Sequence, residues 1–337
     1  MSEWPALLSR LLAGEALSAG DAHAAMGAIM DGEATQAQIA GFVVALRAKG
    51  ETPEEIEGLA RAMLERAQPV ETPGPVVDTC GTGGDRAGTI NVSTVAALVV
   101  AGAGVTVAKH GNRAASSRCG SADLLEALGV KIDLGPDGVA RCLAEAGIGF
   151  MFASVYHPAM AHAAVPRREL GIPTVFNFLG PLTNPARPAA QVVGVSDPRM
   201  LPKLAMVLAR RGTRAMVVRG ADGLDELTVT GPSDVHDVSA GVVRSVTVDP
   251  ASLGLPTHPP GAVAGGDAEH NAAVARAIVA GEPGPSRDIV LLNAAAVLTV
   301  AGVAPSIEEG LGAAAESIDA GRAAAALTRL IETSNAP

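Results

Sequence analysis

Aromatic residues are nearly absent from this sequence of 337 residues. Only 2% are Phe, Trp or Tyr, whereas hydrophobic residues as a whole make up 48%. The chain therefore has enough apolar residues for a sizeable core, and that core must be mainly aliphatic. Its length allows one large domain or two of moderate size.

Cysteine is also scarce. Cys80, Cys119 and Cys142 form neither a metal-ligand spacing nor an even set for disulfides. A reducing compartment, the cytoplasm, is therefore the expected location. Cys80 lies in a glycine-rich loop where a nucleophile is conceivable, but the sequence shows no base to activate it. A small buried thiol is the favoured interpretation.

Basic residues are too few for a polyanion-binding surface. Lys and Arg number 25 against 35 Asp and Glu, a formal net charge of −10. This balance disfavours non-specific binding to nucleic acid or to an anionic membrane, although a local basic pocket is compatible with it. The longest apolar run, 95–108, is broken by glycine and too short to span a bilayer. No signal-peptide pattern opens the chain. We expect neither a nucleic-acid nor a membrane partner.

The pattern after residue 75 predicts an α/β fold. Short apolar runs alternate with segments of helical periodicity, which favours a mostly parallel sheet with helices on its faces. Strands are predicted at 76–77, 105–108, 130–134, 148–152, 191–195 and 214–218, with a hairpin at 235–248. Helices are predicted at 95–101, 122–128, 138–146, 199–210, 268–279, 287–300 and 307–331. Asn293 lies within one of these helices, where a buried packing or capping role is expected.

Residues 5–68 are predicted to be helical throughout. Short helices with apolar faces cannot bury those faces alone, so they need the rest of the chain or a second subunit. Proline and glycine at 69–75 mark a boundary after them.

The densest polar chemistry lies in residues 76–121. Gly81, Gly83 and Gly84 follow a predicted strand, and such glycines let backbone N–H groups approach an anion. Asn91, Ser93 and Thr94 then form the polar start of a helix, which also attracts anions. A second cluster follows the next strand, where a parallel sheet would place it beside the glycine loop. That cluster contains Lys109, His110, Asn112, Arg113, Ser116, Ser117 and Ser121.

The two clusters together favour a polyphosphate ligand, whereas the glycine loop alone would be weak evidence for one. A strand, glycine turn and helix occur in many α/β proteins that bind nothing. The loop also lacks the spacing of the dinucleotide fingerprint and the Gly-Lys-Ser/Thr that closes a P-loop.

The motifs DTCGTGGD, NVST and KHGNRAASS, in this order and spacing, resemble the anthranilate phosphoribosyltransferase family. The resemblance runs from about residue 5 to about residue 332. It implies a small all-helical domain, residues 1–72 completed by about 158–182, and a large α/β domain, 73–157 and 183–337. It also implies transfer of the phosphoribosyl group of phosphoribosyl pyrophosphate (PRPP) to the amine of anthranilate, with release of pyrophosphate, in tryptophan biosynthesis. A homodimer formed through the N-terminal helices is implied as well.

The same resemblance assigns residues to each of the two substrates. It implies no catalytic residue that bonds covalently to a substrate. Anthranilate would be contacted by Gly81, His110, Asn112 and Arg167. PRPP would be bound by Gly81, Gly84, Asp85, Thr89, Asn91, Val92, Ser93, Thr94, Lys109, His110, Gly111, Asn112, Arg113, Ala114, Ala115, Ser116, Ser117 and Ser121.

Magnesium, two ions per subunit with substrate bound, would be held by Ser93, Asp225 and Glu226. An acidic turn such as 225–226 is more often merely solvated. Mg²⁺, however, prefers hard oxygen ligands and shares its shell with substrate phosphates.

Residues 153–185 carry further family patterns, HPAM, RRELG and FNFLGPLTNP. Without the resemblance, Arg167 and Arg168 would be interpreted as solvated arginines of a surface helix. The resemblance assigns Arg167 to the anthranilate carboxylate. Pro166 departs from the pattern, because the family more often has another residue before this arginine.

Two other functions remain open from the sequence. A pyrimidine nucleoside phosphorylase of the same architecture would use related loops, but RRELG and the Asp225–Glu226 pair favour the transferase. A non-catalytic, nucleic-acid-binding homologue would tend to be basic and to have damaged motifs, whereas this chain is acidic with intact ones.

Overall fold

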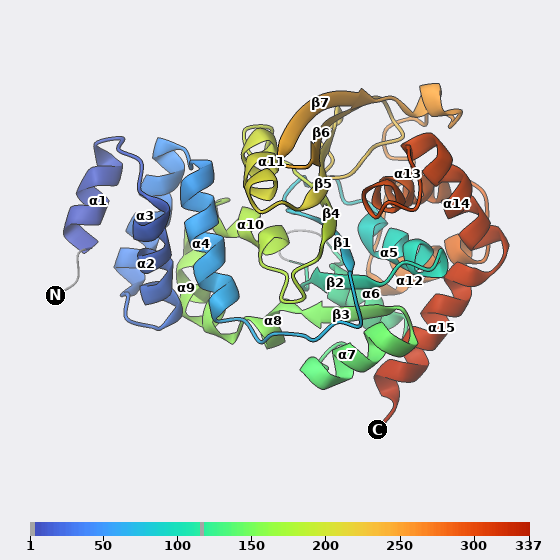
Figure 1. Ribbon diagram of the computed structural model, residues 1–337, viewed down its shortest axis with the longest axis horizontal. Coiled ribbons are helices and arrows are strands. Elements are labelled where there is room, and N and C mark those ends of the chain that lie inside the picture. The colour runs from blue at the N-terminus through green and yellow to red at the C-terminus, as the bar shows by residue number, and fades with distance from the viewer. Residues whose placement is uncertain (1–3, 115–117) are drawn as a thin grey trace.

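The computed structural model describes residues 4–114 and 118–337. Ala115, Ser116 and Ser117, three of the predicted PRPP ligands, lie outside the described residues. Figure 1 shows a helical bundle at the N-terminal end, a sheet in the middle and a second layer of helices toward the C-terminus. In the described part of the chain, no helix combines the length and apolarity needed to cross a membrane.

A seven-stranded mixed sheet forms the centre of the molecule, with strand order β3-β2-β1-β4-β5-β6-β7. The first five strands in this order are parallel, and β6 and β7 form an antiparallel hairpin at one edge. The α/β prediction with a mostly parallel sheet is confirmed. The strands are β1 (Val77–Gly81), β2 (Val107–Gly111), β3 (Ile148–Phe152), β4 (Ala190–Gly194), β5 (Arg214–Gly220), β6 (Ser233–Ser239) and β7 (Val242–Val248).

The order of the strands creates a switch point between β1 and β4. The chain leaves β1 toward β2 and β3 on one side, then returns to form β4 on the other side of β1. β1 and β4 pair from Val77 with Ala190 to Gly81 with Gly194, so their carboxyl ends lie side by side. Open α/β sheets bind ligands outside the carboxyl ends of strands at such a point.

Alternate residues of the central strands pack on opposite faces of the sheet, as the two-residue period requires. Val192 and Val218 share a core with one helical layer, whereas Val193 and Val217 share a core with α11 and the N-terminal bundle. The first layer contains α5 (Val92–Gly102), α6 (Ser121–Ala127), α12 (Ala268–Val279), α13 (Pro285–Val300), α14 (Ile307–Asp319) and α15 (Arg322–Asn335). α7 (Pro136–Glu145) packs on β3, and α11 is Leu201–Arg210.

The N-terminal bundle is built from helices with well-defined starts. Ser18, Thr35 and Thr52 each form a capping box, in which side chain and backbone satisfy each other's free groups. A later segment packs against this bundle, because α9 contacts α2 and α3. The bundle helices are α1 (Trp4–Leu12), α2 (Ala19–Met30), α3 (Gln36–Lys49) and α4 (Pro53–Glu65). The later segment contains α8 (Ala153–Tyr156), α9 (Ala161–Leu170) and α10 (Phe176–Leu179).

Two predicted elements are wrong. Residues 130–134 form no strand, although Val130 and Ile132 are buried as the alternation predicted. The backbone N–H of Lys131 donates to Ser334 Oγ of α15 at 3.1 Å, so a helix end replaces a neighbouring strand. The predicted helix 307–331 is two helices, α14 and α15, because Gly321 adopts a φ of +72° between them.

Two helical glycines give a matched test of the bundle packing. A Cβ on Gly58 of α4 would lie 2.2 Å from the carbonyl oxygen of Ala19, whereas a Cβ on Gly312 of α14 would meet nothing within 4 Å. Gly58→Ala should destabilise the protein, since overpacking costs about 1–3 kcal/mol. Gly312→Ala should stabilise it by up to about 1 kcal/mol through helix propensity. Thermal melts that shift in the same direction for both variants would contradict this account.

Candidate active site

The turn after β5 carries two adjacent carboxylates, Asp225 and Glu226, and packs against the carboxyl ends of β1 and β4. A Cβ on Gly194 would lie 1.5 Å from the carbonyl oxygen of Asp225, and a Cβ on Gly81 would lie 2.1 Å from Asp225 Oδ2. Both strands therefore need glycine as their last residue, because any side chain would displace this turn.

The three residues predicted to hold metal come together at this switch point. Asp225 Oδ2 accepts a hydrogen bond from the backbone N–H of Gly83 at 2.7 Å, and Glu226 Oε1 accepts one from the N–H of Ser93 at 3.2 Å. Lys109, only 2% exposed, donates from Nζ to the carbonyl oxygen of Thr79 at 2.7 Å and to Ser93 Oγ at 3.4 Å. Ser93 thus contacts a buried cation through its hydroxyl and the buried carboxylate of Glu226 through its backbone N–H.

Burial and like charge disfavour ionisation of this acidic pair. Desolvation raises the pKa of Asp225, and the nearby carboxyl of Asp85 raises it further. Desolvation and the charge of Asp225 raise the pKa of Glu226, with Lys109 opposing the shift. A divalent cation would relieve this repulsion.

The donor set fits magnesium that is shared with a substrate. Two carboxylates and a hydroxyl are hard oxygen ligands. Among residues 4–114 and 118–337, no group of three or more His, Cys, Asp or Glu side chains forms a complete metal site. The remaining coordination positions would therefore come from substrate oxygens and water, as Mg²⁺ commonly requires.

The glycine loop leaves β1 in a conformation that requires glycine. Gly83, Gly84 and Gly88 have φ values of +70°, +85° and +62°. Ser196 Oγ donates to the carbonyl oxygen of Gly83 at 2.7 Å, which fixes the loop beside β4. Thr89 pairs with Ala264 in an isolated bridge that holds the far end of the loop.

The predicted polar start of α5 is present, but the side chain of Asn91 serves another purpose. Asn91 is the N-cap residue, but its side chain makes no capping hydrogen bond. Its Nδ2 donates to the carbonyl oxygen of Cys119 at 3.0 Å, and its Oδ1 accepts from Asn271 Nδ2 at 2.9 Å. Asn91 thus links the start of α5 to the loop before α6 and to helix α12, while Val92, Ser93 and Thr94 form the first turn of α5 behind it.

The loop after β2 is closed by one carboxylate. Asp123 Oδ2 accepts hydrogen bonds from the N–H groups of Ala114 and Gly120, both at 2.9 Å. Ser121 Oγ donates to the carbonyl oxygen of Asn112 at 3.2 Å. A Cβ on Gly111 would lie 2.2 Å from Ser121 Oγ, so this glycine is needed for the close approach.

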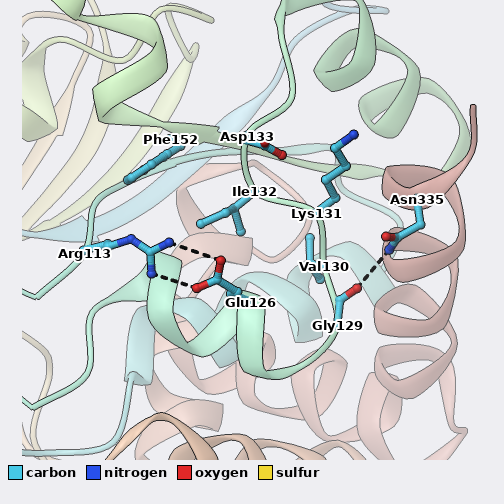
Figure 2. A pocket seen from close by; sticks show the side chains of 9 residues that line it. All are labelled: Arg113, Glu126, Gly129, Val130, Lys131, Ile132, Asp133, Phe152 and Asn335. Atoms are coloured by element: carbon cyan, nitrogen blue, oxygen red, sulfur yellow. Dashed lines mark hydrogen bonds and ion pairs between the residues drawn. The ribbon is translucent and has the colours of Figure 1, made fainter.

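Arg113 stands apart from the other predicted PRPP ligands. Its guanidinium pairs with Asp123 and Glu126, each at 2.8 Å, and lies over the Phe152 ring at 5.7 Å. Figure 2 shows it directed toward Glu126 at a cavity of about 350 Å³ that Lys131 and Asp133 also line. Its role as a PRPP ligand remains a prediction.

Two neutral histidines lie beside the end of β2. His110 Nδ1 donates to the carbonyl oxygen of Gly180 at 3.3 Å, and His157 Nε2 donates to that of Thr183 at 2.9 Å. Their ring centroids are 5.1 Å apart. Burial lowers the pKa of both rings, that of His110 to about 3. In the described structure His110 Nε2 is buried without a hydrogen-bond partner, and a ligand N–H could supply one.

The sequence did not predict that His157, which opens the HPAM motif, lies beside His110. Arg167 was predicted, and it lies in α9 with its guanidinium carbon 5.4 Å from the Phe176 ring centroid. Burial lowers the pKa of Arg167. No carboxylate of the described residues forms an ion pair with it. Pro166 lies inside α9 without ending it. Arg167 and His110 therefore contact the two ends of segment 176–180, from Phe176 to the carbonyl of Gly180.

Cys80 is poorly suited to act as a nucleophile. Burial raises the pKa of its thiol well above the ordinary value, and the neighbouring Asp78 raises it further. Its Sγ donates to Asp78 Oδ2 at 3.7 Å. Cys80 was predicted to be a small buried thiol, whereas the structure shows it half-buried at the end of β1.

The acidic pair predicts how the stability of the metal-free protein depends on pH. In the folded protein burial raises the pKa values to about 7 for Asp225 and about 8 for Glu226, from the ordinary values of 3.8 and 4.5. Between the two sets of values the folded protein holds protons that the unfolded chain has lost, so stability falls as pH rises. Thermal melts in a chelator from about pH 5 to about pH 9 should show this fall in wild type. The Asp225→Asn/Glu226→Gln variant should show a smaller fall, and equal slopes would contradict the assignment.

Two protein-family models match this chain. A model described as "Glycosyl transferase family, helical bundle domain" matches residues 5–67. A second model, "Glycosyl transferase family, a/b domain", matches residues 73–324.

Known relatives match nearly the whole chain. The anthranilate phosphoribosyltransferase of Acidothermus cellulolyticus is 59% identical over 339 residues, covering 99% of this chain and 96% of the relative. The crystal structure of the Thermus thermophilus anthranilate phosphoribosyltransferase matches with a TM-score of 0.93 and 47% identity, over 98% of this chain and 99% of that one. The Saccharomyces cerevisiae enzyme, in complex with PRPP and Mg, matches with a TM-score of 0.90 and 29% identity, over 98% and 97%.

Proposed function

Because this chain belongs to the anthranilate phosphoribosyltransferase family, we propose that its substrate sites lie at the carboxyl ends of β1, β2 and β4. The enzyme transfers the phosphoribosyl group of PRPP to the amine of anthranilate, releasing pyrophosphate, in tryptophan biosynthesis. The two alternative functions, a pyrimidine nucleoside phosphorylase and a nucleic-acid-binding homologue, are not favoured, because the relatives are anthranilate phosphoribosyltransferases. The gathering of Ser93, Lys109, Asp225 and Glu226 at the switch point is the observation that carries the site assignment.

The donor side is suited to a leaving pyrophosphate. The enzyme uses magnesium, as the complex of the yeast relative supports, and we propose two ions per subunit held with Ser93, Asp225 and Glu226. When bound, Mg²⁺ offsets negative charge on the departing pyrophosphate. Lys109 and the N-terminus of α5 add fixed positive charge at the same place. The remaining PRPP ligands that the sequence predicts are part of this proposal.

The acceptor side is suited to an aromatic amine that carries a carboxylate. In the reaction the amine nitrogen forms a bond to C1 of the ribose as the C1–O bond to pyrophosphate breaks, and the nitrogen then loses a proton. The guanidinium of Arg167 would pair with the carboxylate. Because burial lowers the pKa of His110 to about 3, its Nε2 is suited to accept a hydrogen bond from the amine and not to carry its proton. Positioning of the two substrates is then the main contribution of the protein.

A direct assay tests the overall function. Protein mixed with anthranilate, PRPP and Mg²⁺ should consume the fluorescence of anthranilate, and omission of either PRPP or Mg²⁺ should stop the loss. Phosphate-dependent release of base from a pyrimidine nucleoside, without consumption of anthranilate, would instead identify a phosphorylase.

Substitution of Arg167 tests the acceptor site. Arg167→Ala should raise KM for anthranilate about ten- to a hundredfold, because a hydrogen bond to a charged group contributes about 1.5–3 kcal/mol. KM for PRPP should change little, since Arg167 lies on the bundle side of His110. The exposed neighbour offers the control, and Arg168→Ala should leave both KM values near wild type. Equal effects of the two substitutions would place the acceptor pocket elsewhere.

The homodimer is a further proposal. The packed helices α1 and α3 expose Leu12 (79%) and Val44 (38%), and a second copy of the chain would cover them. Light scattering should show a dimer for wild type and a monomer for Leu12→Lys/Val44→Lys. Val242→Lys, at a comparably exposed valine of β7, should remain a dimer. A monomeric wild type, or dissociation of the Val242 variant, would refute this interface.

We also propose the predicted division into domains and a cytoplasmic location. A small domain of residues 1–72 and about 158–182 is supported by the packing of α9 on α2 and α3. The large domain is then 73–157 and 183–337. The three cysteines form no disulfide with one another, which is compatible with a reducing compartment.

A further inference from the structure

We propose that Asn293 is a positioning residue, which holds the backbone of Leu227 and thereby fixes Asp225 and Glu226 for metal binding. The inference rests on the proposed role of this acidic pair. Asn293 lies within α13, far from the glycine loop in sequence, and would contribute to the site only through Leu227.

The side-chain amide of Asn293 forms three hydrogen bonds, two of them with the backbone of Leu227. Its Oδ1 accepts from the N–H of Leu227 at 3.0 Å, and its Nδ2 donates to the carbonyl oxygen of Leu227 at 2.8 Å. Nδ2 also donates to the carbonyl oxygen of Ile289, in its own helix, at 2.9 Å. Asn293 is completely buried, and its neighbours in α13 from Ile289 to Val300 are buried as well. An apolar residue here would leave both backbone groups of Leu227 unpaired.

The acidic turn needs such a support because its two carboxylates are adjacent and buried. Like charges in a desolvated place repel, and the backbone must resist their separation. Asp222 closes the turn onto itself, since its Oδ2 accepts from the hydroxyls of Thr228 and Thr230, both at 2.6 Å. Asn293 acts differently, because it attaches the turn to the helical layer.

The same helical layer carries the other predicted metal ligand. α13 packs against α5, whose first turn contains Ser93. Ser93 donates its N–H to Glu226 Oε1 at 3.2 Å. Asn293 therefore keeps the carboxylates in register with Ser93. Its loss should weaken metal binding while leaving the anthranilate side, at α9 and α10, little affected.

The main test measures metal affinity. Calorimetric titration of Mg²⁺ into the protein with PRPP present should show binding about 10- to 100-fold weaker in Asn293→Leu, the range typical for residues that orient metal ligands. In the metal-free protein, the amides of Leu227 and Thr228 should exchange hydrogen faster than in wild type. Binding of anthranilate should stay near wild type.

Controls in the same helix separate positioning from stability. Thr299→Val removes a buried hydroxyl that donates only within α13, to Ala295 at 2.8 Å. Val297→Ala removes buried volume and should lower the melting temperature. Neither substitution should change Mg²⁺ affinity. If Asn293→Leu does not fold, Asn293→Ala, which leaves room for water to satisfy Leu227, is judged by the same criteria.

The Asp225→Asn/Glu226→Gln variant makes the possible failures distinguishable. If this variant binds Mg²⁺ like wild type, the proposed metal site is wrong. If it loses Mg²⁺ binding while the Asn293 variant melts earlier but binds Mg²⁺ normally, only the inference about Asn293 is overturned, and Asn293 is merely structural.

Discussion

The burial of two adjacent carboxylates at the end of a parallel sheet is the constraint on which the rest of the site depends. Asp225 and Glu226 fit there only because β1 and β4 end in glycine, where any side chain would collide with the turn. Their charge is balanced in part by Lys109, which is itself buried. The site therefore favours a bound cation, and the strand order places it at the switch point of the sheet.

The acceptor side has the opposite electrostatic character. His110 and His157 are neutral because burial lowers their pKa values. Each donates a hydrogen bond from one ring nitrogen to a backbone carbonyl of segment 180–183. Arg167 supplies a cation that forms no ion pair with a carboxylate among the described residues. An excess of acid on one side and this guanidinium on the other suit the transfer of a phosphoribosyl group from a pyrophosphate, which magnesium would hold, to the amine of an acceptor that carries a carboxylate. Arg167 and His110 both contact segment 176–180. Because Arg167 lies in α9, which packs on α2 and α3, the N-terminal bundle also contributes to the site.

The sequence predicted most strands, the hairpin and the buried role of Asn293, because periodicity and glycine positions report local structure directly. It also predicted that Ser93, Asp225 and Glu226 belong together, through the resemblance and not through spacing. It did not predict the pairing of Arg113 with Glu126, the link from Asn91 to Cys119 or the absence of strand 130–134. Each of these depends on a tertiary partner. For residues 130–134 that partner is Ser334, some two hundred residues away, and apolar alternation cannot distinguish a helix end from a neighbouring strand.

Proton release on magnesium binding tests the central claim most directly. Mg²⁺ is titrated calorimetrically into the protein with PRPP near pH 7, in buffers of different ionisation enthalpy, and the same titration of PRPP alone is subtracted. If Asp225 and Glu226 hold protons that the cation displaces, wild type should release on the order of one proton per ion bound. The Asp225→Asn/Glu226→Gln variant should release none. Binding without proton release in wild type, or equal release in both proteins, would contradict the account.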